Sequence, residues 1–360
     1  MRKIHPEYKA LMDYIQRGLL GDVKKTVDNI KLMPRRVDWC SILHNNSRDT
    51  ALHVVCRSKN DYMLSYVMTE GMHTCLEQSN VYGNRPLHEA AKISNIFAVN
   101  TFIEIGVKVD ALNNALNTPL MLSVSSRDED SAAVVDALLG EGSNSALVNQ
   151  FGQTASHVCS GLGSLEALQL LLKHDSRTCS VTRLDGRSAL HAAAHHGRED
   201  LLETLQERGH QQDSNVRALC GSTPIMDALR RGHVSTAAAI TALWPLTHVA
   251  AKDAKGRGLC QVAAEGGYVD AIKFAVNDHK LSPLQTDDFG ACSLHSAAGA
   301  GRCEAVQFLV QDLQVPVDVK DNAGKTPLWW ALQNRHTVCA EQLLQLGAQP
   351  LAEPAALKQR

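Results

Sequence analysis

One short run of this sequence has the residue types of a phosphate-binding loop. Residues 324–326 are Gly-Lys-Thr, and in such a loop the lysine and the hydroxyl hold the phosphates and the magnesium ion of a nucleotide. The motif also requires a glycine five residues earlier, where this chain has Val319. Residues 161–163 have a Gly-x-Gly spacing but lack the third glycine of a dinucleotide fingerprint. We therefore expect no nucleotide cofactor.

Histidine is the second residue type that could do chemistry, because the chain has 16 of them and imidazole binds metals and protons. Five share one place in a recurring phrase and should lie about one helix layer, roughly 10 Å, apart, too far to share one ion. We expect each to bridge the Thr or Ser of its own phrase and the backbone of the next unit. They are His53, His88, His157, His191 and His295. A metal-binding or pH-sensing role is the alternative for His195 and His196.

The sequence has no sign of nucleophilic catalysis, so we predict no enzyme, no catalytic residue and no metal site. It has no Gly-x-Ser-x-Gly elbow and no cysteine with a recognisable catalytic signature. The 10 cysteines are spread singly from Cys40 to Cys339, without a Cys-x-x-Cys pair. An even number of cysteines could form disulfides. In a long chain without a visible secretory signal, reduced thiols and an intracellular location, in the cytoplasm, the nucleus or both, are expected instead.

Composition excludes two classes of partner. The net charge is −2, whereas a general nucleic-acid binder carries a basic excess. No apolar run approaches the roughly 18 residues of a membrane span. We expect neither direct nucleic-acid binding nor membrane binding, and we expect a monomer.

A short sequence phrase recurs about nine times, and it predicts the helices that position these residues. It is written "RPLHEAA", "NTPLMLS", "RSALHAAA", "STPIMDAL" and "KTPLWWAL", among other forms, and its Leu-like position recurs every 33 to 36 residues. A Thr-Pro-Leu-His phrase with this period resembles the ankyrin repeat. The resemblance implies an all-α ankyrin-repeat solenoid of about ten stacked helix-turn-helix units with β-hairpin-like finger loops. Such units bind proteins through an extended concave surface and act as scaffolds.

The ends of the chain depart from the phrase, as the terminal units of a solenoid do. We expect an N-terminal capping repeat and connection over 1–48, an array of about nine repeats over 49–350 and a polar tail over 351–360. The acidic stretch "SSRDEDS" is interpreted as a solvated insertion, or as a site that attracts a basic partner. The repeat that begins at Gly258 lacks the Thr, Pro and His of the phrase, which predicts a weaker helix start there.

Residues that the phrase leaves free at the loop tips and on the inner helices are the candidates for contact with a partner. Exposed aromatic and arginine side chains are the usual anchors of protein interfaces. In "PLWWALQNRH" we expect Trp329 to pack inward and Trp330 to face the groove beside Arg335, either as core or as an anchor. The candidate residues are Tyr82, Asn84, Glu89, Lys92, Phe151, Arg187, His195, His196, Asp227, Arg230, Arg231, Arg257, Phe289, Lys325, Trp330 and Arg335.

The sequences "NRPLHEAA", "RSALHAAAHHG" and "AIKFAVNDHKLSP" are also similar to those of ankyrin-repeat proteins that act as cofactors of alanyl-tRNA synthetase. That resemblance implies this enzyme as partner and a role in translational fidelity, in which lysine side chains capture wrongly activated serine. The stretch 109–251 contains only Lys173, so the acceptor lysines have no match here. An adaptor for a ubiquitin ligase is a further alternative, although no recognisable SOCS box follows the last repeat.

Overall fold

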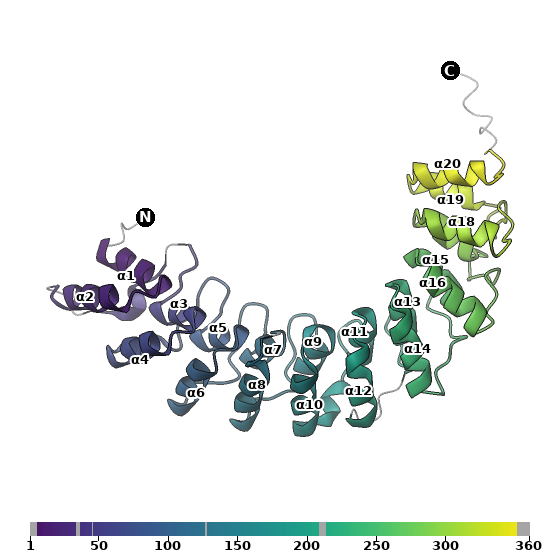
Figure 1. Cartoon of the computed structure of the whole chain (residues 1–360). Coiled ribbons are helices and arrows are strands. Elements are labelled where there is room, and N and C mark those ends of the chain that lie inside the picture. Colours follow the sequence, from purple (N-terminus) through teal and green to yellow (C-terminus); the bar gives the residue numbers. More distant parts are fainter. Residues whose placement is uncertain (1–5, 34–36, 45, 127, 209–213, 351–360) are drawn as a thin grey trace, which may run out of the picture. The chain divides into compact units, whose positions relative to one another are not determined.

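Helices form every regular element among the residues that the computed structural model describes, which are 6–33, 37–44, 46–126, 128–208 and 214–350 (Figure 1). The chain divides into two compact units, Met1–Arg183 and Leu184–Arg360. Within each unit, helices that follow one another in the chain pack in pairs, and each pair packs on the next. The predicted all-α architecture of stacked helix-turn-helix units is therefore confirmed.

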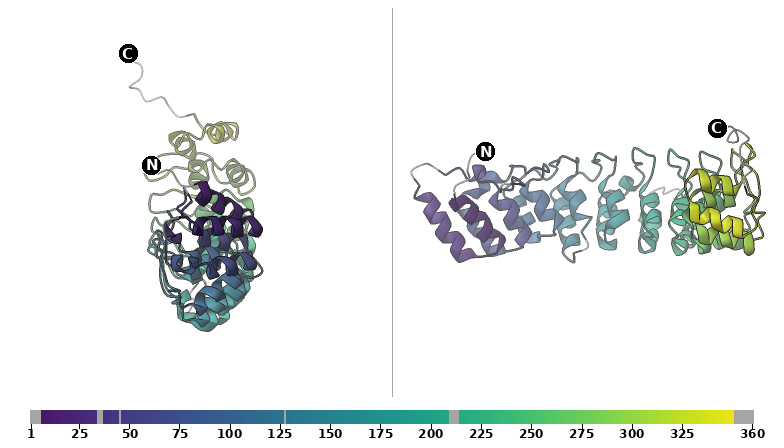
Figure 2. Two further views of the ribbon diagram at one scale, coloured as in Figure 1. Left: turned by 90° about the vertical axis from the view of Figure 1, so that its left-hand side faces the viewer. Right: turned by 90° about the horizontal axis from the view of Figure 1, so that it is seen from above.

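The first unit begins with a helix pair that lacks the recurring phrase and continues with four pairs that carry it. Helix α1 packs against α2 and against α3, the first inner helix. The elements are α1 (Pro6–Gln16), α2 (Leu20–Lys31), η1 (Trp39–Ser41), α3 (Ala51–Ser58), α4 (Asp61–Thr69), η2 (Met72–Cys75), α5 (Pro86–Lys92), α6 (Ile96–Glu104), α7 (Pro119–Ser123), α8 (Ser131–Gly140), α9 (Ala155–Leu162), α10 (Leu165–His174) and η3 (Ser176–Cys179). In this unit the loops between successive pairs protrude at one edge of the helices (Figure 2).

The second unit contains five further pairs, and its inner helices α11, α13, α15, α17 and α19 pack in sequence order. The elements are α11 (Ala189–His195), η4 (Glu199–Leu201), α12 (Leu202–Arg208), α13 (Pro224–Arg230), α14 (Val234–Leu243), α15 (Leu259–Gly266), α16 (Val269–Lys273), η5 (Phe274–Asp278), α17 (Ser293–Gly299), α18 (Cys303–Gln311), α19 (Pro327–Gln333) and α20 (Thr337–Gln345). The predicted tail 351–360 lies outside the described residues.

The phrase determines how each inner helix begins. Where it has both Thr and Pro, as at Thr118, the hydroxyl accepts a hydrogen bond from the Met121 N–H at 3.2 Å and Pro119 fills the first helical position. The predicted bridge is confirmed at His53 and His191, which follow a Thr or Ser, whereas His88 and His295 bond Arg85 and Cys292 in place of the expected Thr or Ser. His53 Nδ1 accepts from the Thr50 N–H at 3.1 Å, and its Nε2 lies 2.8 Å from the Asn84 carbonyl of the next unit.

The repeat that begins at Gly258 keeps this bridge without a histidine. Gln261 is fully buried, its Oε1 accepts from the Gly258 N–H at 2.7 Å, and its Nε2 donates to the Ala291 carbonyl at 3.0 Å. The amide thus makes both bonds that the imidazole makes elsewhere. The start of α15 thus keeps the bond to the N-cap N–H, but Gly258 has no hydroxyl with which to cap the helix, so the expected weaker helix start stays a prediction.

The loop tip before α17 is held by an Asx side chain and is bonded to the loop that follows it. Asp287 Oδ1 accepts from the N–H groups of Phe289 and Ala291, both at 2.9 Å. The Asn322 N–H of the following loop donates to the Phe289 carbonyl at 2.9 Å. Side chains at this tip are therefore presented from a fixed backbone, although the loop contains no strand.

The acidic insertion between α7 and α8 contacts an earlier repeat of the same unit. Lys59, which follows α3, lies 2.7 Å from Asp128 and 3.7 Å from Asp130. Its hydrogen bond to Asp128 lowers the pKa of that carboxyl, which is solvent-exposed. This part of the insertion is therefore engaged within the chain, which disfavours the alternative that it attracts a basic partner.

Candidate functional site

The first hollow is an open depression of about 620 Å³ in the first unit. It collects four of the residues that the sequence singled out as candidates. Its lining consists of Asp49, Arg57, Asn80, Val81, Tyr82, Asn84, Glu89, Lys92, Asn113, Asn114, Ala115 and Leu122. Tyr82 at a loop tip and Lys92 at the end of α5 are exposed, as expected.

A salt-linked network forms the floor of the first hollow. Arg57 lies 2.7 Å from Asp49 and 3.4 Å from Glu89. Burial alone would raise the pKa of Asp49, but hydrogen bonds from Arg57, Ser47 and Asn80 outweigh it and lower this pKa to about 2. Both acids are thus paired with the arginine, and neither is placed to act as a free general base.

Two of the predicted contact residues belong to this floor. Asn84 and Glu89 are only 7% and 5% exposed, and the Asn84 amide donates to the Glu89 carboxylate at 2.9 Å. The expectation that they are free surface is wrong, because the inner-helix acid turns toward the asparagines of its own loop. Asn84 and Glu89 therefore hold Arg57 and the loop in place, and their side chains do not project from the surface.

The second hollow is a depression of about 340 Å³ in the second unit. Ser296, Gly299 and Ala300 form a floor of small residues in and just after α17. Phe289, which is 59% exposed at its loop tip, and the half-buried Trp330 of α19 stand beside this floor. The remaining lining residues are Lys255, Arg257, Glu265, Asp287 and Asn334.

The Trp330 side chain contacts Asp321 and His295, and it also lines the second hollow. Its Nε1–H donates to Asp321 Oδ2 at 2.9 Å, and its ring meets the His295 ring edge-on at a centroid distance of 5.6 Å. Trp330 thus lines the second hollow, and Asn334 rather than the expected Arg335 lines it beside Trp330. The expectation that Trp329 packs inward is wrong, because it is only partly buried and its ring lies 4.7 Å from the Lys325 ammonium.

The polar rim of the second hollow is internally paired. Arg257 lies 2.7 Å from the buried Asp253 and 3.1 Å from Glu265. Burial alone would lower the pKa of Arg257, but these carboxylates raise it, so the guanidinium stays charged. Arg230 also approaches Glu265, at 3.7 Å. A partner that fills the hollow would therefore meet arginine side chains that are already paired with carboxylates.

A third group of candidates lies on α11 and α13. Asp227 is only 1% exposed and binds Arg187 at 3.0 Å, which contradicts its expected place on the surface. His195 and His196 lie edge to face, with ring centroids 5.1 Å apart. Burial, followed by the charge of Arg231, lowers the pKa of both imidazoles. They are therefore neutral at physiological pH, in an environment that is already cationic.

The remaining candidates lie outside both hollows. Phe151 is 53% exposed at a loop tip of the first unit, and Arg335 is exposed just after α19. Arg335 has φ +64°, a left-handed conformation that ends this helix.

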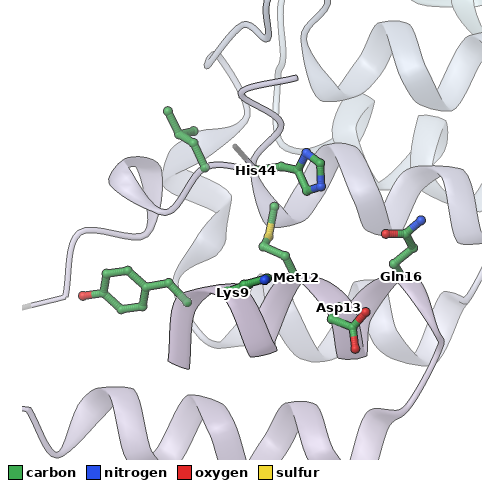
Figure 3. Close-up of a pocket in the computed structure, with 7 residues that line it drawn as sticks. Lys9, Met12, Asp13, Gln16 and His44 are labelled. Atoms are coloured by element: carbon green, nitrogen blue, oxygen red, sulfur yellow. The ribbon is translucent and has the colours of Figure 1, made fainter. Parts of the chain in front are cut away.

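A smaller hollow of about 120 Å³ lies at the N-terminal helix pair, where the sequence showed no sign of one (Figure 3). Met12, Asp13 and Gln16 of α1 lie on one side, and His44 faces them from the segment before α3. This region does not follow the repeat phrase, so no template separates its free positions from its structural ones.

Among the residues that the structure describes, no group of three or more His, Cys, Asp or Glu side chains could hold a metal ion. Within the same residues, no helix combines the length and apolar character needed to cross a membrane.

Comparisons with known proteins agree with the repeat architecture. A family model described as "Ankyrin repeats (3 copies)" matches residues 120–217 and 259–353. The chain is 31% identical over 262 residues to the B-cell lymphoma 3 protein homolog of Mus musculus, covering 70% of this chain and 49% of that protein. It is 30% identical over 167 residues to the probable E3 ubiquitin-protein ligase XBOS33 of Oryza sativa subsp. japonica, covering 45% of this chain and 32% of that protein. The chain thus spans half or less of the length of these relatives.

A solved structure supports the fold in the same way. The crystal structure of the ankyrin repeat domain of Bcl-3, "a unique member of the IkappaB protein family", matches with a TM-score of 0.50 and 24% identity. The match covers 63% of this chain and 96% of that domain.

Proposed function

Because the chain belongs to the ankyrin-repeat family, we propose that it is a non-catalytic scaffold that binds a protein partner through the second hollow. The observation that carries this proposal is the placement of two aromatic side chains, Phe289 and Trp330, beside a floor of small residues. Aromatic anchors at the centre of a contact contribute most of the energy of many protein interfaces. An apolar side chain of the partner would fill the hollow.

The two aromatic residues differ in what they do without a partner. Trp330 already hydrogen-bonds to Asp321, whereas Phe289 exposes 59% of its surface from a loop tip whose backbone is fixed. Exposed apolar surface on a rigid loop is available for binding at little cost in ordering. Phe289 is therefore the better single probe of the proposed site.

A selection from a random peptide library tests this proposal and does not require that the partner be identified first. Peptides are selected on the wild-type chain and counter-selected on a Phe289→Ala, Trp330→Ala variant whose helicity is checked by circular dichroism. We expect enrichment of peptides with an apolar anchor. Enriched peptides that bind the variant equally well would refute the second hollow as the site.

We further propose alanyl-tRNA synthetase as the first partner to test, because the repeat sequences resemble those of proteins that act as its cofactors. Purified synthetase is titrated with the wild-type chain and with Phe289→Ala. Saturable binding that the substitution weakens would support both the partner and the site. Absence of binding at micromolar concentrations would refute this partner and leave the peptide selection as the test of the hollow.

Serine capture by lysine is a separate step that the same mixture can test. Lys173 is exposed on α10 and is the only lysine between residues 109 and 251. The chain is incubated with the synthetase, ATP and serine, and seryl-lysine is sought by mass spectrometry in the wild type and in Lys173→Arg. A complex without any adduct would support the scaffold role and exclude the chemical one.

An adaptor role for a ubiquitin ligase is the second candidate, favoured by the similarity to the protein named as the probable ligase XBOS33. Under this proposal the chain supplies the substrate-binding surface, and ubiquitin transfer depends on a ligase partner. Co-purification of ligase activity with the chain from cells would support it, and purification without such activity would oppose it.

A further inference from the structure

Two cysteines that are distant in the sequence meet in the first unit. Cys40 lies in η1 and Cys75 ends η2, and their sulfur atoms are 2.7 Å apart. Thr74 Oγ1 lies 3.8 Å from the Cys40 sulfur and 3.9 Å from the Cys75 sulfur. A separation of 2.7 Å is well below an ordinary contact between two thiols and not far above the length of a disulfide bond, about 2.05 Å.

The local structure explains why the two thiols meet. Asp38 caps η1 by accepting the Cys40 N–H at 3.1 Å. Gly71, with φ +91°, starts η2, and a side chain there would lie 3.6 Å from the Trp39 ring. Cys40 and Cys75 are 35 residues apart, which is one period of the repeat. Equivalent positions of neighbouring units lie side by side in such a stack, so this spacing brings the cysteines together.

We propose that Cys40 and Cys75 form a disulfide when the chain meets a hydroperoxide such as hydrogen peroxide. The Cys40 thiolate attacks one peroxide oxygen, the O–O bond breaks, and hydroxide leaves, which gives a sulfenic acid. The Cys75 sulfur then attacks the Cys40 sulfur and the S–O bond breaks. The departing hydroxide takes the Cys75 proton as water. Two thiols and one peroxide thus become one disulfide and two waters.

The accessibility of the two thiols sets their order of reaction. Cys40 is partly exposed, whereas Cys75 is 1% exposed. Burial, followed by the hydrogen bond with Cys40, raises the pKa of Cys75 to about 12. A buried, protonated thiol reacts slowly with peroxide in solution. Cys40 therefore takes the oxidant, and Cys75 resolves the sulfenic acid.

Other cysteines of the chain provide internal comparisons. Cys220 is exposed but alone at its loop tip. Cys303 and Cys339 share a thiol hydrogen bond, but they lie on the helices α18 and α20. The Cys303 thiol is also engaged elsewhere, because it donates to the Gly301 carbonyl at 3.8 Å. Cys40 and Cys75 lie on short turns instead.

The disulfide would link the segment before α3, which contains His44, to the end of η2. It closes a loop that contains α3 and α4, and it fixes the segment that faces α1 across the N-terminal hollow (Figure 3). Loop closure restricts the unfolded chain and thereby stabilises the folded one. Oxidation should therefore slow amide hydrogen exchange in α3 and α4.

The test uses the full chain treated with graded hydrogen peroxide, alkylated and digested with trypsin without reduction. Trypsin releases peptides 37–48 and 60–92, each with a single cysteine, because Arg85 precedes a proline. We expect a linked peptide, lighter by two hydrogens than the sum of its parts, at lower peroxide than any link between Cys303 and Cys339. Exchange in α3 and α4 should slow as it forms.

Two variants complete the design. Cys40→Ser should abolish the linked peptide and leave Cys75 open only to alkylation after unfolding, whereas Cys220→Ser should change neither result. Circular dichroism verifies that both variants fold. The proposal is overturned if Cys40 ends as sulfinic or sulfonic acid without linkage to Cys75. It is also overturned if cysteines link in random combinations.

Discussion

Gln261 tests whether the bridge between repeats, rather than the histidine itself, holds the stack together. Replacing it with leucine removes both bonds of a fully buried side chain. The Gly258 N–H then loses its partner, and an unpaired buried donor costs about 1–3 kcal/mol. The Ala291 carbonyl keeps the bond from the Asp287 N–H at 3.0 Å, so that end loses only about 1 kcal/mol. We expect Gln261→Leu to destabilise this region by about 2–4 kcal/mol in total.

Hydrogen exchange with mass spectrometry reports this loss locally, since a repeat array need not unfold in one step. A loss of about 2–4 kcal/mol accelerates exchange in α15 by about 30- to 900-fold. Gln261→His is the matched control, because the imidazole makes the same two bonds in other repeats, and it should remain within about 1 kcal/mol of the wild type. Equal exchange in Gln261→Leu and the wild type, or equal damage by both substitutions, would refute the reasoning.

Three further predictions follow from single residues. Gly290→Ala should destabilise the chain by about 1–3 kcal/mol more than Gly324→Ala in thermal unfolding, because both have left-handed φ but only Gly290 lacks room for a side chain. Equal effects would contradict this. Burial lowers the pKa of His88 from 6.5 to about 4, so its contribution is intact above pH 6.5 and about 2–3 kcal/mol is lost as pH falls to about 4.5. His88→Gln should remove this part of the pH dependence, and an unchanged profile would oppose the assignment. Lys59→Ala removes an exposed ion pair and should leave the unfolding temperature nearly unchanged in the same assay, so a clear loss of stability would contradict the solvated pairing.

The fold was predictable because the phrase and its period carry the same information as the structure. Thr118 and Pro119 specify a helix start by local chemistry, and histidines such as His53 specify a contact one period away. The sequence did not predict that Gln261 replaces the histidine, because a glutamine that makes the same two hydrogen bonds does not match the residue types of the phrase. The sequence pattern identifies residue types, whereas the bridge depends on donor and acceptor geometry.

The candidate site was predictable only in part. Phe289, Trp330 and Tyr82 were found because an aromatic residue at a free template position has no structural role in the phrase. Asp227 and Glu89 were misplaced, because their burial depends on arginines elsewhere in the chain. Their pairing is a property of side-chain conformation, which a repeat template leaves open.

The meeting of thiols in the first unit could have been suspected from spacing alone. Cys40 and Cys75 stand one period apart, and one period is the distance at which residues of neighbouring repeats lie side by side. Their contact also depends on the two short turns η1 and η2, which lie outside the repeat phrase. The period brings the units together, and only the structure shows that the side chains face each other.

The affinity of a selected peptide for Phe289→Ala, compared with Phe151→Ala, tests the central claim most directly. Both residues are exposed aromatics at loop tips, and only Phe289 lines the second hollow. Isothermal titration should show about tenfold or greater weakening for Phe289→Ala and unchanged affinity for Phe151→Ala. Equal affinity of the wild type and both variants would contradict the account.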